Sequence, residues 1–174
     1  IVAAALEEKA IKPSTTFDED GPLKIGGYYI RTWNDKYSGK IDISHILQTS
    51  SNVGMVYIGE KMGDEKVRKY LDLYGLGELT NIDVQGEVPS SLRSKWYPID
   101  YATATFGQGV AVTQILMITA FSALLNDGWL MRPYVVKKMI AEEGSSSIIY
   151  PKKVRRILSK KTAAQVRKML YETV

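Results

Sequence analysis

The chain has 174 residues, of which 45% are hydrophobic and 24% charged, and its formal net charge is +4. These values are ordinary for a globular domain. It contains no cysteine, which excludes disulfides, thiol catalysis and thiolate metal sites. Because His45 is the one histidine, a zinc cluster or a Ser/His/Asp triad has a single imidazole candidate. We therefore expect no metal and no cofactor, and any proton transfer would use Ser, Lys or carboxylate side chains.

The first forty residues predict the end of a helix followed by a β-hairpin. The alanine-rich segment 1–10 is typical of a helix that stops before Pro13. Residues 23–33 form two short strand-like runs about Gly26-Gly27, a pair typical of a tight hairpin turn. Segments rich in turn-forming or acidic residues are expected to be exposed turns and loops: 14–22, with its acidic run 18–20, and 34–40.

The middle of the chain predicts a series of helices. They are expected at 42–48, 53–62, 64–74, 98–105 and 113–125, and the stretch 76–97 is expected to be a loop. Asp42 and Asp64 are the expected N-caps of the first and third of these helices. Gly107 and Gly109 are interpreted as a tight turn, because no P-loop lysine or dinucleotide fingerprint accompanies them. In the last helix, helical spacing predicts an apolar buried face made of Ile115, Ile118, Phe121, Leu124 and Leu125.

The last forty residues predict a β-hairpin and a final helix. Strand-like runs lie within 132–140 and at 148–150, with Gly144 and three serines as the turn between them. Ser159 is the expected cap of a helix whose apolar face is Ala163, Val166, Met169 and Leu170. Residues 137–174 hold 10 Lys and Arg against 3 Asp and Glu, a net of +7. These basic residues interleave with apolar ones, so we interpret them as a solvated face, with a polyanion site as the alternative. Trp33 and Trp129 border loops and are expected to pack against neighbours.

One short motif lies at the break between two predicted helices, and it has two interpretations. Ser50-Ser51-Asn52 could simply end one helix and cap the next, with Ser51 or Asn52 accepting a hydrogen bond from a free backbone N–H. At such a break, however, the Ser50 hydroxyl and the Asn52 amide could face one pocket, with Ser51 turned elsewhere. A hydroxyl can pass a proton and a carboxamide can hold a peptide bond in register, which together suit acyl transfer. The triplet alone does not decide between these interpretations.

The residues around this motif resemble a known family. The segments AAALEEKAIKPSTTFD, KIGGYYIRTWN, ISHILQTSSNVGMVYIGEKMG and TFGQGVAVTQILMITAFSALLNDGWLMRPYVVKKM occur in this order. Together they resemble the transpeptidase domain of class B penicillin-binding proteins, over nearly all of the chain. The resemblance implies an α+β, predominantly helical fold. It implies that 1–174 is a partial transpeptidase domain, truncated at both ends. Two small β-hairpins are expected within these residues, and most of the central sheet is expected to lie outside them.

Three motifs build the active site in that family, and only one is present here. The family's Ser-x-x-Lys supplies the nucleophile, and no Ser or Thr of this chain has Lys three positions later. The family's Lys-Ser/Thr-Gly binds the substrate carboxylate from a strand, and the near match Lys161-Thr162-Ala163 is instead expected to be a first helical turn. By resemblance, Ser50 and Asn52 are the catalytic residues of the Ser-x-Asn motif. We expect this chain alone to be inactive.

The family also implies substrates, partners and location. The parent enzyme would bind peptidoglycan stem peptides and β-lactams, and would be anchored in the cell membrane with its catalytic domain on the extracytoplasmic side. Partners in cell-wall synthesis are implied, nucleic acid is not, and the chain could dimerise or pair with the rest of its domain. A β-lactam sensor, a serine β-lactamase-related domain and a non-catalytic pseudo-transpeptidase module remain as alternatives.

Overall fold

The computed structural model describes residues 1–90 and 92–173 and shows seven helices and eight strands within them. The helices are α1 (Val2–Glu7), α2 (Ile43–Gln48), α3 (Asn52–Met62), α4 (Asp64–Leu73), α5 (Pro98–Thr105), α6 (Gln114–Ser122) and α7 (Lys160–Tyr171). The strands are β1 (Thr16–Glu19), β2 (Leu23–Ile25), β3 (Tyr28–Ile30), β4 (Gly39–Asp42), β5 (Trp129–Arg132), β6 (Lys138–Ile140), β7 (Ser146–Ile148) and β8 (Lys152–Arg156). The expected α+β, mainly helical class is confirmed.

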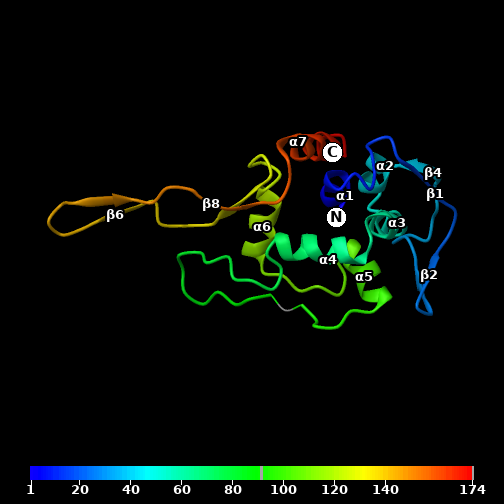
Figure 1. Ribbon diagram of the computed structural model, residues 1–174, viewed down its shortest axis with the longest axis horizontal. Coiled ribbons are helices and arrows are strands. Elements are labelled where there is room, and N and C mark those ends of the chain that lie inside the picture. The colour runs from blue at the N-terminus through cyan, green and yellow to red at the C-terminus, as the bar shows by residue number, and fades with distance from the viewer. Residues whose placement is uncertain (91, 174) are drawn as a thin grey trace.

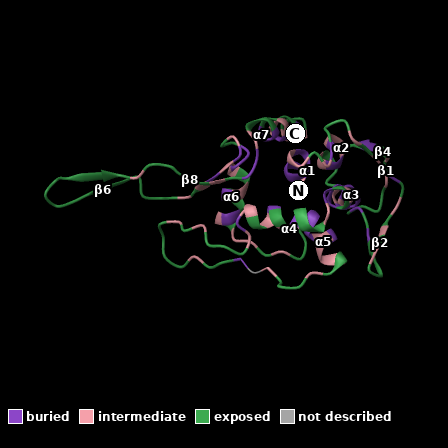
Figure 2. Ribbon diagram, viewed as in Figure 1, coloured by how far each residue is buried: buried purple, intermediate pink, exposed green. Residues whose placement is uncertain are grey.

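The helices form a central body with β structure at either end (Figure 1). Strands β1 to β4 lie beside α2 and α3, at the end that carries the Ser-x-Asn break. Strands β5 to β8 leave the opposite end, where the β6–β7 hairpin extends far from the helices. Figure 2 shows that burial is concentrated in the helical body, whereas the hairpin is exposed along its length.

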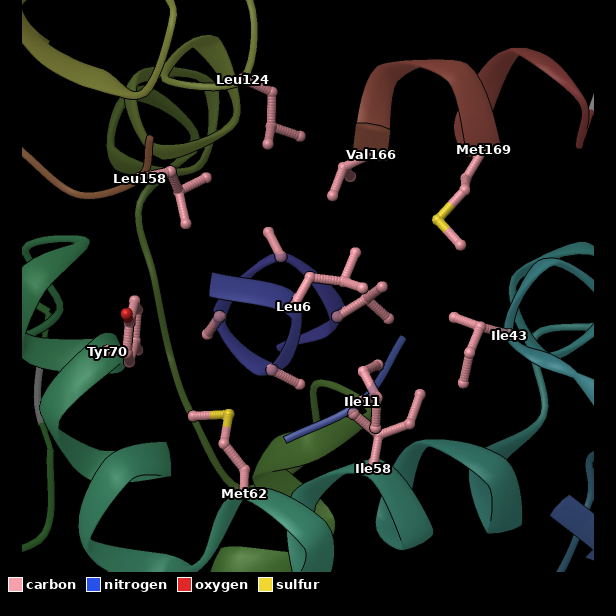
Figure 3. Close-up of a cluster of buried hydrophobic side chains, with 14 of the residues drawn as sticks. Leu6, Ile11, Ile43, Ile58, Met62, Tyr70, Leu124, Leu158, Val166 and Met169 are labelled. Atoms are coloured by element: carbon pink, nitrogen blue, oxygen red, sulfur yellow. The ribbon is translucent and has the colours of Figure 1, made fainter. Parts of the chain in front are cut away.

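The core is built around α1 (Figure 3). Five of the six residues of this short helix are buried, and Ala4 and Ala5 have no exposed surface. A helix that is apolar on all sides must be surrounded, and its small alanines let neighbouring helices approach closely. Helices α3 and α7 both pack on it. Side chains from these and other elements converge on α1: Ile11, Ile43, Ile58, Met62, Tyr70, Leu124, Leu158, Val166 and Met169.

The β structure consists of four two-stranded antiparallel sheets within the described residues. Two of them are the predicted hairpins, β2–β3 with its turn at Gly26 and Gly27 (φ 55° and 89°), and β6–β7. The segments of β1–β4 were expected to be mostly turn or loop, and that expectation was wrong, whereas the β5–β8 pair was not predicted. Each joins segments about twenty residues apart and encloses one hairpin. Pairing between distant segments leaves little local signal, which explains the miss.

The capping signals of the sequence are largely confirmed. Asp42 caps α2 by accepting from the His45 N–H at 2.8 Å, and Ser159 caps α7 by accepting from the Thr162 N–H at 3.2 Å. Asp64 was predicted to be the N-cap of α4, but Gly63 (φ 85°) occupies that position. Asp64 is instead the first helical residue, where its negative charge still favours the helix N-terminus.

The predicted buried face of the helix after residue 113 was mostly wrong, since Leu124 is the one of its five residues that is buried. Leu116 and Thr119 are the buried residues of α6, whereas Ile118 is 65% and Phe121 56% exposed. Because this helix is apolar on nearly every side, its hydrophobic pattern does not define which side packs. Trp33 also differs from expectation, since 76% of it is exposed rather than packed.

Candidate active site

Three residues, 49–51, separate α2 from α3, and their backbone forms a Schellman motif. Thr49 is the C-cap of α2, the Ser50 N–H donates to the Leu47 carbonyl at 3.3 Å, and the Ser51 N–H donates to the Ile46 carbonyl at 3.0 Å. This motif requires a left-handed residue after the C-cap, and Ser50 supplies it with a φ of 51°. Glycine is usual at that position, because other residues pay roughly 1 kcal/mol for it. A serine held there is a strained residue.

Ser51 is buried, and its hydroxyl has two structural roles. Only 2% of the residue is exposed. The hydroxyl oxygen accepts from the Gly54 N–H at 2.9 Å, which makes Ser51 the N-cap of α3. The same hydroxyl donates to a carboxylate oxygen of Glu19. The capping interpretation of the motif is therefore confirmed for Ser51.

The two flanking residues are placed differently. Ser50 is exposed, and its hydroxyl has no hydrogen-bond partner in the part of the chain that the structure describes. Asn52 is half-buried, and its amide nitrogen donates to the Arg31 carbonyl at 2.9 Å. That bond fixes which way the amide points and leaves its oxygen as an acceptor. The motif thus offers one free hydroxyl and one oriented carboxamide on either side of a buried serine.

The segment after β3 borders Asn52 and carries its own polar cluster. The Arg31 guanidinium pairs with the Asp35 carboxylate at 3.0 Å, and the Tyr37 hydroxyl donates to the same carboxylate at 2.9 Å. These hydrogen bonds, from Tyr37 first and Arg31 second, lower the pKa of Asp35. The exposed Trp33 lies between the two charged residues in sequence. The Arg31 carbonyl that accepts from the Asn52 amide therefore lies beside this polar cluster.

Other candidate sites offer less chemistry. A pocket of about 370 Å³ among the described residues is lined mostly by apolar side chains of α1, α6 and neighbouring helices. Neither Ser50 nor Asn52 lines it or three smaller pockets. Residues 1–90 and 92–173 contain no cluster of three acidic or histidine side chains that could hold a metal ion. The longest helix in those ranges has twelve residues, and none has the length and apolar character needed to span a bilayer.

Three residues considered in the sequence analysis occupy structural positions. Lys161 and Thr162 lie in the first turn of α7, as predicted, and not on a strand. His45 is half-buried in α2, and its Nε2 is buried with no hydrogen-bond partner among the described residues. The single imidazole therefore belongs to the packing of α2.

Sequence reasoning missed Glu19. It was expected to be solvated within an acidic run, but only 3% of it is exposed. Strand β1 explains this, because Phe17 and Glu19 share one face and point inward while Asp18 points to solvent. Had Phe17 been recognised as an inward-facing strand residue, the period of two would have placed Glu19 inside as well.

Comparison with known proteins assigns the chain to a family. A family model described as the penicillin binding protein transpeptidase domain matches residues 1–174. Stage V sporulation protein D of Bacillus subtilis is 34% identical over 99% of this chain and 28% of its own length. A probable peptidoglycan D,D-transpeptidase, FtsI of Caulobacter vibrioides, is 28% identical over 99% of this chain and 28% of its own length. The chain therefore belongs to the penicillin-binding protein transpeptidase family and spans about a quarter of the length of these relatives.

Solved structures agree with this assignment. Penicillin-binding protein 2X of Streptococcus thermophilus superposes with a TM-score of 0.90 at 27% identity, over 97% of this chain and 25% of that chain. Penicillin-binding protein 3 of Mycobacterium tuberculosis, solved in complex with aztreonam, gives a TM-score of 0.88 at 27% identity, over 97% of this chain and 38% of that chain. The predicted family and fold are confirmed.

Proposed function

We propose that this chain is the part of a peptidoglycan D,D-transpeptidase that lies between its Ser-x-x-Lys and Lys-Thr-Gly motifs. The proposal is supported by the family match over residues 1–174 and by the resemblance of the relatives named as peptidoglycan transpeptidases. One structural observation carries it to particular residues. The Ser51 hydroxyl is buried and already bonded as the cap of α3. Ser50, by contrast, is exposed in a strained conformation, and its hydroxyl has no partner among the described residues. Strain at a polar residue without a structural bond favours a functional role.

In this proposal Ser50 relays a proton. The nucleophilic serine of the complete enzyme attacks the carbonyl of a D-Ala-D-Ala bond, forms an ester with it, and expels the terminal D-Ala as an amine. The departing nitrogen needs a proton, and the Ser50 hydroxyl gives up its own while it takes another from the catalytic lysine. The second half-reaction reverses these transfers, since the incoming amine must lose a proton as it forms the new peptide bond.

Asn52 orients the donor peptide. The bond from its amide nitrogen to the Arg31 carbonyl leaves the amide oxygen free, and that oxygen can accept from a substrate peptide N–H. A β-lactam carries a similar amide beside a reactive carbonyl, so it would bind in the same register and acylate the same nucleophile. The parent protein would accordingly bind penicillins covalently.

Location and partners follow from the same proposal. The enzyme's substrate lies outside the cytoplasmic membrane, so this domain would work on the extracytoplasmic side, held at the membrane by a segment outside residues 1–174. Other proteins of cell-wall synthesis would be its partners, and residues 1–174 would pair with the remainder of the transpeptidase domain.

The test is covalent labelling by penicillin. We expect the intact mass of the complete protein to rise by one acyl group after incubation with penicillin G, and the 174-residue chain to show no increase. A complete protein that never gains mass would contradict the proposal, and an acylated 174-residue chain would contradict the assignment of the nucleophile to a segment outside it.

Turnover separates the rival functions. A serine β-lactamase would release the hydrolysed drug quickly, whereas a transpeptidase or a sensor would keep the acyl group for many minutes. Transfer of a stem peptide to an amine acceptor, seen only with the transpeptidase, then separates these two. A pseudo-transpeptidase would show neither labelling nor transfer.

A further inference from the structure

We propose that Glu19 is a positioning residue for the Ser-x-Asn motif. Its buried carboxylate fixes Ser51, and through Ser51 it sets the positions of Ser50 and Asn52. The proposal rests on the proposed function, because positioning has meaning only if those two residues act on a substrate.

The contacts form a short chain of hydrogen bonds inside the protein. One Glu19 oxygen accepts from the Ser51 hydroxyl, and the other accepts from the Ser38 N–H at 3.1 Å. The Ser51 oxygen in turn accepts from the Gly54 N–H at 2.9 Å. Glu19 and Ser51 are 3% and 2% exposed, so water does not compete for these bonds. Two hydrogen bonds therefore fix the orientation of the Ser51 hydroxyl.

Packing of β1 does not require a buried carboxylate at position 19. No Lys or Arg among the described residues pairs with Glu19, so a carboxylate is buried with only hydroxyl and amide donors beside it. Burying a carboxylate without a cation is costly, and an apolar residue on β1 would pack without that cost. The nearby N-terminus of α3, which Ser51 caps, offsets part of it. The presence of Glu19 in spite of this cost is explained if its carboxylate holds Ser51 in position.

The fold transmits this position to both flanking residues. The Ser51 N–H donates to the last turn of α2, and the Ser51 hydroxyl accepts from the first turn of α3. Ser51 is therefore fixed to both helices. Strand β1 pairs with β4, whose last residue, Asp42, is the N-cap of α2. The β1–β4 sheet thus contacts both helices, and besides the stacking of Phe17 on Tyr57 of α3 it reaches the Ser51 cap through Glu19. If Ser51 shifted, the strained Ser50 on one side and Asn52 on the other would shift with it.

The test uses acylation of the complete protein by a fluorescent penicillin. We expect Glu19→Gln to lower the acylation rate at saturating penicillin by about 10- to 100-fold, because small displacements of a reacting group have effects of that order. The penicillin concentration at half-maximal rate should change much less. Asp18→Asn is the matched control, since Asp18 is on the same strand but exposed, and it should react at the wild-type rate.

A double-mutant cycle separates positioning from a general loss of structure. If Glu19 acts through Ser50 and Asn52, then adding Glu19→Gln to a protein that already carries Ser50→Ala and Asn52→Ala should cause little further loss. Losses that multiply would overturn the proposal, as would a wild-type acylation rate in Glu19→Gln. Should Glu19→Gln fail to fold, Ser51→Ala removes the same bond from the other partner and must give the same non-additive result. A wild-type protein that takes up no penicillin would refute the proposed function itself, before any variant is compared.

Discussion

Truncation of the two adjacent serines of the motif should change the stability of the domain by very different amounts. In Ser51→Ala, α3 loses its N-cap, which costs about 1 kcal/mol. The buried Glu19 also loses its one side-chain donor, and a hydrogen bond to a charged group contributes about 2 kcal/mol. The free energy of unfolding of the domain should therefore fall by about 3 kcal/mol. In Ser50→Ala the side chain removed is exposed and makes no hydrogen bond among the described residues, so the change should stay within about 0.5 kcal/mol.

Urea unfolding of the complete protein, followed by tryptophan fluorescence, measures this difference. Hydrogen exchange at the Gly54 amide gives a local readout, because that N–H donates to the Ser51 hydroxyl. It should exchange about 100-fold faster in Ser51→Ala and at the wild-type rate in Ser50→Ala. Equal losses of stability in the two variants would refute the division of roles between the serines.

Three further predictions follow from other contacts. Ser50→Gly relieves the left-handed backbone and should raise the free energy of unfolding by about 1 kcal/mol, while it slows acylation by penicillin as much as Ser50→Ala does. Gly128→Ala should lower the free energy of unfolding by more than about 2 kcal/mol, measured by urea unfolding, because the new Cβ would overlap the Leu158 carbonyl at a φ of 87°. The hydrogen bond from Lys66 is the main cause that lowers the pKa of Glu8 to about 2, so this carboxylate adds stability that is complete above about pH 4.5 and disappears as the pH falls toward 2. Glu8→Gln should flatten that part of the pH profile of unfolding, and an unchanged profile would contradict the role of the Glu8 contacts.

Local chemistry predicted the parts of the fold that are fixed locally. Asp42 and Ser159 were recognised as caps because a side-chain oxygen before an apolar run satisfies free N–H groups within the same few residues. Gly26 and Gly27 revealed a hairpin because its turn requires positive φ at both positions. In the Ser-x-Asn motif, the same reasoning correctly gave Ser51 a capping role.

Features that depend on distant segments could not be predicted in this way. The burial of Glu19 depends on the pairing of β1 with β4 and on a hydrogen bond from Ser51, which is 32 positions away in the sequence. The buried side of α6 depends on which neighbour it packs against, because its own sequence is apolar on nearly every side. Trp33 is exposed because no described segment lies over it, which its hydrophobicity could not reveal. The catalytic role of Ser50 and Asn52 remains a proposal that rests on the family.

The acylation rate of Ser50→Ala in the complete protein tests the account most directly. A relay of protons through a hydroxyl contributes about 100-fold or more, so the rate with a labelled penicillin should fall by at least that factor. The free energy of unfolding should stay close to that of the wild type, and Thr49→Ala, at the neighbouring helix end, should react normally. A Ser50→Ala protein that is acylated at the wild-type rate would contradict the claim that this exposed serine takes part in the chemistry.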